Sequence, residues 1–183
     1  MMDLKAALGL SQLFSLMVFV TIARWYVMPW LRLQERATAL IALLWPHVFR
    51  YVALQAYSAQ HAGFPISDSG VNRIVYGDVG GMILALIAIT TLRYEARAAI
   101  ALVWLLLAAT AVDTVLNVAG GIREHLFGAA TGVTWMVVSF YVPLLMVSLG
   151  LTVWQLYSRQ GEPLRRSVAA AAPRVANHLS MAR

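Results

Sequence analysis

Three ionisable side chains of this sequence lie in stretches that are otherwise strongly apolar. Arg50 follows His47 in the stretch LLWPHVFRYV, and Asp78 and Asp113 lie in two later apolar stretches. Charged side chains inside a membrane are costly and normally pair with one another. We therefore expect Arg50 to lie between the two aspartates, with His47 one helical turn deeper.

Binding of a small anionic or lipid-like ligand is the function that this cluster favours. The guanidinium would supply the cation, and hydrogen-bonding side chains from several segments converge at one depth. The main alternative is purely structural, because a buried ion-pair network can simply fix how helices pack. The expected ligand-binding residues are Gln12, His47, Arg50, Tyr51, Asp78, Asp113 and Asn117.

Acid/base catalysis is a second possible chemistry. Residues 76–78 read YGD, and Asp113 follows in the next apolar stretch. This element resembles, over four residues, the GxGD motif of the aspartyl intramembrane proteases, with Val75 in place of the first glycine. The resemblance implies a carboxylate pair, Asp78 and Asp113, with His47 relaying a proton. Arg50 between the carboxylates would keep both ionised, which disfavours a pair that shares one proton.

Haem ligation is a third possibility. His47 would be one axial ligand, and His61 or His125 would supply the second from an outer link. Membrane cytochromes usually take both ligands from spans, which makes haem a minor alternative. The chain has no cysteine and no HExxH motif, so the sequence predicts no metal site.

The elements that carry these residues are predicted to be membrane spans. Of the 183 residues, 61% are hydrophobic, compared with roughly 45–50% in soluble domains. A helix needs about 20 apolar residues to cross a bilayer core. The sequence predicts an all-α integral membrane protein, a five-transmembrane-helix bundle in residues 1–160, followed by a disordered basic tail, 161–183. The spans are expected at about 5–28, 37–60, 75–92, 98–119 and 128–157.

The distribution of basic residues predicts the orientation of the bundle. The positive-inside rule places the side richer in Lys and Arg in the cytoplasm. The N-terminus is therefore expected outside and the C-terminus in the cytoplasm, in a bacterial inner membrane. The net charge of +6 arises from loops and the tail, so no nucleic-acid partner is expected. The richer side carries Arg24, Arg32, Arg36, Arg93, Arg97, Arg159, Arg165, Arg166, Arg174 and Arg183, against Lys5, Arg73 and Arg123.

Polar residues are concentrated in the outer halves of all five predicted spans. At about 100° per residue, Arg50 and Tyr51 share one helical face, as do Thr110, Asp113 and Asn117 on another span. We therefore expect an outward-facing pocket, covered by the link 58–74. The apolar inner halves disfavour a conduction path through one copy. The expected partners are lipids, the pocket's ligand and, for an accessory subunit, further copies or a larger membrane complex.

Overall fold

The computed structural model describes residues 3–164, which are all helical or connecting and contain no strand. Five helical segments in this part are long and apolar enough to cross a membrane, by length and composition. The predicted five-helix bundle is confirmed to that extent. Most of the predicted tail, residues 165–183, lies outside the described residues. The segments are Leu4–Leu33, Arg36–His61, Asp68–Arg93, Ala99–Arg123 and Gly132–Ser158.

Three of the five segments change helix type along their length. The first contains α1 (Leu4–Ile22), a π-helical turn (Ala23–Val27) and α2 (Met28–Leu33). The second contains α3 (Arg36–Val48), a 3₁₀ stretch (Phe49–Leu54) and α4 (Gln55–His61). The fifth contains α7 (Gly132–Met136), a π-helical turn (Val137–Tyr141) and α8 (Val142–Ser158). The third and fourth are the uninterrupted α5 (Asp68–Arg93) and α6 (Ala99–Arg123).

A proline lies close to each change of helix type. Pro29 and Pro143 each come two residues after a π-helical turn, and Pro46 precedes the 3₁₀ stretch by three residues. Proline lacks the N–H of a normal helical hydrogen bond, and its ring crowds the preceding turn. Local π and 3₁₀ geometry is a known way to absorb such a disturbance. The prolines therefore explain why these segments are not uniform α-helices.

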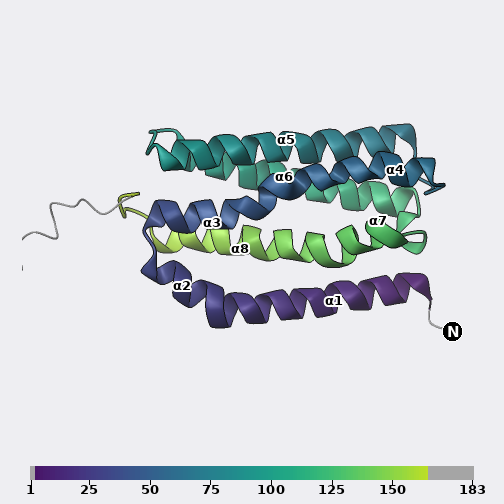
Figure 1. The fold of residues 1–183 in the computed structure, drawn as a ribbon, viewed down its shortest axis with the longest axis horizontal. Helices are drawn as coiled ribbons and strands as arrows, with labels where there is room; N and C mark the ends of the chain where they lie inside the picture. Colours follow the sequence, from purple (N-terminus) through teal and green to yellow (C-terminus); the bar gives the residue numbers. More distant parts are fainter. Residues whose placement is uncertain (1–2, 165–183) are drawn as a thin grey trace, which may run out of the picture.

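The five segments lie side by side and alternate in direction (Figure 1). One end of the bundle holds the start of α1 together with α4 and α7, and we call it the α4 end. The other holds α2 and the end of α8, and we call it the α2 end. The first segment lies at the edge, with 11% of its apolar window buried, whereas the second segment is central, with 44% buried.

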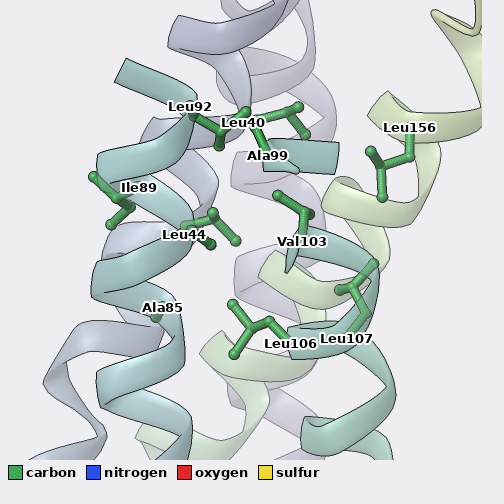
Figure 2. Close-up of a cluster of buried hydrophobic side chains, with 11 residues drawn as sticks. Leu40, Leu44, Ala85, Ile89, Leu92, Ala99, Val103, Leu106, Leu107 and Leu156 are labelled. Atoms are coloured by element: carbon green, nitrogen blue, oxygen red, sulfur yellow. The ribbon is translucent and has the colours of Figure 1, made fainter. Parts of the chain in front are cut away.

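The main apolar core fills the α2 half of the bundle. It is built from α3, the second half of α5, the first half of α6 and the end of α8. Figure 2 shows these side chains meeting between the helices. This cluster is entirely apolar, and the buried Arg50 lies outside it. Its buried members are Leu40, Leu44, Ala85, Ala88, Ile89, Leu92, Ala99, Val103, Leu106, Leu107 and Leu156.

The predicted long link 58–74 is mostly helical in the structure. α4 continues to His61 and α5 begins at Asp68, so only residues 62–67 connect them. Ser67 caps α5, because its Oγ accepts the backbone N–H of Gly70 at 3.0 Å. Side-chain capping of this kind satisfies a free N–H in the first helical turn. The cap explains why the third span starts seven residues before the predicted position 75.

Candidate functional site

Arg50 lies at the centre of an ion-pair network that joins three helical segments. Its Nε donates to Asp78 Oδ1 on α5 at 2.7 Å, and its Nη2 donates to Asp113 Oδ2 on α6. Its Nη1 donates to Thr110 Oγ1, also on α6, at 2.9 Å. Only 2% of Arg50 is exposed. The structure therefore places Arg50 between the two aspartates, as the sequence predicts.

Glycines provide the room that these charged groups occupy. A Cβ added at Gly81 would collide with the Arg50 guanidinium, and one added at Gly77 would collide with the Asp113 carboxylate. Small residues let a neighbouring helix approach closely in membrane bundles. In the structure, the space beside each glycine is filled by a charged side chain, from the second segment at Gly81 and from α6 at Gly77.

The 3₁₀ stretch decides which side chains of the second segment face inward. At three residues per turn, positions three apart eclipse each other, and Arg50, Ala53 and Ala56 are all buried. Tyr51 is 47% exposed, and its ring lies 6.2 Å from that of Phe49. Tyr51 therefore lies outside the cluster, and the prediction that it shares a buried face with Arg50 is wrong.

Hydroxyl groups of the fifth segment hold the bent second segment in place. Tyr141 donates its hydroxyl to the carbonyl of Pro46 at 2.7 Å, and Ser148 donates to the carbonyl of Leu43. Backbone groups released near a proline in a membrane helix must find partners inside the protein. Sequence reasoning missed both residues, although a hydroxyl in an apolar span is itself a signal for such a bond.

A cavity of about 420 Å³ lies between the helices, extends towards the α4 end and reaches the network. Its walls are largely apolar, with Phe64, Ile74 and Leu145 among the lining side chains. The carboxylates of Asp78 and Asp113 and the guanidinium of Arg50 contribute charged groups to the cavity wall. Of the seven predicted ligand-binding residues, the cavity is lined by Gln12, Arg50, Asp78, Asp113 and Asn117, but not by His47 or Tyr51.

Two amide side chains add polar groups to the cavity wall. Gln12 Nε2 donates to the backbone carbonyl of Val138 at 3.2 Å, within the π-helical turn of the fifth segment. The Asn117 side chain lies within hydrogen-bonding reach of the Asp113 carboxylate. Its Oδ1 is buried and has no hydrogen-bond partner among residues 3–164. Asn117, which lines the cavity, therefore has an acceptor oxygen that no donor of residues 3–164 satisfies.

His47 is enclosed rather than presented to the cavity. It is 0% exposed, and neither ring nitrogen has a hydrogen-bond partner in the described part of the chain. His61 lies on α4 near the end of the bundle, where its Nδ1 is 3.0 Å from the carbonyl oxygen of Tyr57. Residues 3–164 hold no cluster of three or more metal-ligating side chains.

The cavity has an apolar border on the flank of the bundle. Val115 and Val118 of α6 and Met146 of α8 all line it, and all three are exposed. Exposed apolar side chains on a membrane-spanning segment are suited to contact with lipid chains. The cavity is therefore bordered by lipid-compatible surface on this flank.

At the α4 end, the cavity is covered by residues of the 62–67 link. Phe64 and Ile66 line the cavity, and Ile66 packs in a small apolar cluster with Val71 and Leu126. Glu124 holds the link, because its Oε2 accepts the backbone N–H of Ser67 at 2.9 Å. This hydrogen bond, together with the nearby arginines 73 and 123, lowers the pKa of Glu124 from its usual value.

Comparisons with known proteins identify a family. No curated protein and no solved structure matches the chain. The model of a family described as a domain of unknown function (DUF8737) matches residues 7–157, which include almost all of the five helical segments. The chain therefore belongs to this family.

Proposed function

We propose that this protein is a multi-pass membrane protein that binds a lipid-like ligand in the cavity beside Arg50. The observation that carries the proposal is the combination of an apolar cavity with a polar group of side chains at one place in its wall. Its volume of about 420 Å³ lies within the usual range of roughly 300–1,000 Å³ for ligand sites. An amphipathic molecule matches both parts of this lining.

The charges of the cluster favour a lipid-like ligand over a small anion. One guanidinium faces two carboxylates, and each of its three nitrogens already donates to a protein oxygen. A bound anion would find no free cation and would meet two carboxylates. A head group with hydrogen-bond donors fits better, because Asn117 Oδ1 lacks a partner among the described residues.

Entry from the side of the bundle fits a ligand that already resides in the bilayer. The border formed by Val115, Val118 and Met146 is apolar and exposed. The bias of basic residues towards the α2 end favours a cytoplasmic α2 end and a cavity in the outer leaflet of a bacterial inner membrane. In this arrangement the ligand exchanges with lipids of that leaflet.

Native mass spectrometry of the gently extracted full-length protein tests the proposal. A retained lipid-like molecule is expected on the wild type. Thr114→Phe should remove it, because Thr114 lines the cavity and a phenyl ring would occupy its space. Val112→Phe is the matched control, because Val112 is exposed on the same helix and does not line the cavity. Equal retention in both variants, or none in the wild type at any lipid concentration, would refute cavity binding.

The acid/base and haem alternatives have less support from the site. Asp78 and Asp113 each pair with Arg50, which favours two ionised carboxylates over a pair sharing a proton. His47 does not line the cavity, so a substrate or a haem in the cavity would not meet its ring. If the enzyme alternative holds, Asp78→Asn or Asp113→Asn abolishes turnover while the protein still folds.

A further inference from the structure

A second pocket lies at the α2 end, opposite the cavity. Its volume is about 520 Å³, and it lies among α2, the start of α3, the end of α8 and the residues that follow α8. Residues 162–164 close it against α3, because the Ala37 backbone N–H donates to the carbonyl of Leu164 at 2.9 Å. The charged side chains in its lining are Arg32, Glu35, Arg36, Arg159 and Glu162.

The three arginines of this pocket differ in how far they are neutralised. Arg159 pairs with Glu162, with its Nη2 2.7 Å from Oε2. Arg32 makes no ion pair with any carboxylate of residues 3–164, and its guanidinium lies 5.7 Å from the ring centre of Trp154. Arg36 donates through Nη1 to the backbone carbonyl of Glu162 at 2.9 Å. Three cations and two carboxylates leave the pocket with an excess of positive charge.

Two buried donors in the same lining lack an acceptor. Arg36 is 8% exposed, and its Nε has no hydrogen-bond partner among the described residues. Gln155 is 0% exposed, and its Nε2 is likewise without a partner there. The Gln155 amide is oriented by Arg159, whose Nη1 lies 3.4 Å from Oε1. An unsatisfied buried donor is costly, so these two groups indicate a ligand that supplies acceptor oxygens.

The position of the pocket fits a head group of the bilayer. Trp30 and Tyr157 are exposed near it on α2 and α8, and aromatic side chains favour the membrane interface. Basic pockets between helices at this depth are suited to phosphorylated lipid head groups. We propose that the α2-end pocket binds a phosphate group that carries net negative charge, with Arg32, Arg36 and Gln155 as its donors.

Thermal-shift titration of the full-length protein in detergent tests this site with three probes. They are short-chain phosphatidylglycerol, short-chain phosphatidylcholine and inorganic phosphate. We expect phosphatidylglycerol to bind more tightly than phosphatidylcholine, because the positive choline group of phosphatidylcholine neutralises the negative charge of its phosphate. If inorganic phosphate also binds, the pocket recognises the phosphate group without the rest of the lipid. If only phosphatidylglycerol binds, the pocket recognises the lipid head group. Failure of both anionic probes to bind would overturn the proposal.

Variants separate specific binding from general attraction of anions. Arg32→Gln should weaken phosphatidylglycerol binding roughly tenfold, as expected for loss of one charge-assisted hydrogen bond. Arg97→Gln removes the same charge from an exposed position at the same end and should change binding less than about twofold. Glu35→Gln should strengthen binding, since it removes a carboxylate from the lining. Equal losses in the two arginine variants would contradict a built site.

The two sites of the protein can be told apart in the same experiment. Thr114→Phe fills the cavity beside Arg50 and lies away from the α2-end pocket. We expect it to leave phosphatidylglycerol binding at the α2 end unchanged. If it abolishes that binding without unfolding the protein, the phosphate group is bound in the cavity instead and the α2-end proposal is wrong.

Discussion

Among residues 3–164, two arginines are buried, Arg50 near the middle of the bundle and Arg36 at its α2 end, and their guanidinium groups find partners to different degrees. Arg50 has two carboxylates and a hydroxyl as partners, all from other helices. Arg36 has a backbone carbonyl at Nη1, whereas its Nε has no partner in residues 3–164. The comparison suggests that burial alone does not mark a binding cation. Arg50 is committed to the fold, whereas Arg36 still has a donor for a ligand.

The surroundings of the two arginines explain this difference. Arg50 lies in the middle of its segment, where apolar side chains supply no hydrogen-bond acceptors, so polar side chains of other helices must provide them. Arg36 lies at the first residue of α3, at an end of the bundle where head groups and water can take part. A missing protein partner is therefore tolerable at the α2 end but would be costly near the middle of the bundle.

Removal of each guanidinium is the strongest test of this comparison. Arg50→Met leaves Asp78 and Asp113 partly buried without their cation, and we expect a loss of about 3–5 kcal/mol in the free energy of unfolding. Arg36→Met leaves one carbonyl without a donor, and we expect a loss of about 1–2 kcal/mol. Unfolding of the purified variants in SDS titrations measures both values.

A triple variant separates the structural role of the Arg50 network from a binding role. Arg50→Met, Asp78→Leu and Asp113→Leu together remove every charge of the network, and such replacements often restore stability. We expect stability near that of the wild type but loss of the ligand retained in the cavity. Similar losses for Arg50→Met and Arg36→Met would contradict the distinction between the two arginines.

Two neighbouring glycines of α5 provide a matched test of the space around Arg50. Gly81→Ala places a methyl group against the guanidinium, and we expect a loss of about 1–3 kcal/mol, as for other overpacked sites. Gly80 has open space beside it, and Gly80→Ala should gain up to about 1 kcal/mol from helix propensity. The difference in free energy of unfolding is the measurement. A stabilising Gly81→Ala would show that Arg50 can move away without cost.

His47 gives a smaller effect of the opposite sign. Its ring is fully enclosed and both nitrogens lack partners in the described residues. Replacing an unsatisfied polar group by an apolar one of similar size removes a desolvation cost. We expect His47→Leu to raise the free energy of unfolding by about 1 kcal/mol and to leave ligand retention unchanged. A clear loss of stability would indicate that the ring has a partner, such as a buried water.

The sequence predicts the parts of this protein that follow from charge and hydropathy. Five apolar stretches predict five helices long enough to cross a membrane, and Arg50 inside one of them predicts carboxylates from the others. The face of α6 that carries Thr110, Asp113 and Asn117 is also predicted correctly, because α6 is a regular α-helix. These predictions depend only on helix period and on the cost of an unpaired charge.

Other features depend on local geometry that the helix period does not contain. Tyr51 is exposed although Arg50 beside it is buried, because consecutive residues of a helix point in different directions and the predicted stripe is too wide to be buried as a whole. The serine cap at position 67 extends α5 towards the N-terminus. Sequence reasoning treats Arg32, Arg36 and Arg159 only as signals of orientation, since their meeting in one pocket depends on how distant segments pack.

The smallest expected effect concerns pH and the link over the cavity. The backbone N–H of Ser67, and then the arginines 73 and 123, hold the pKa of Glu124 below its usual value of 4.5. A carboxylate with a lowered folded-state pKa stabilises the fold above its unfolded pKa, and this contribution is lost as the pH falls through the folded pKa. Between about pH 6 and about pH 3, we expect the Ser67 amide to become less protected from hydrogen exchange, after correction for intrinsic rates.

In Glu124→Gln this pH dependence should disappear, and its persistence would show that another group holds the link. Because Glu124 lies near the bundle surface, the change in overall unfolding free energy should be much smaller than for Arg50→Met.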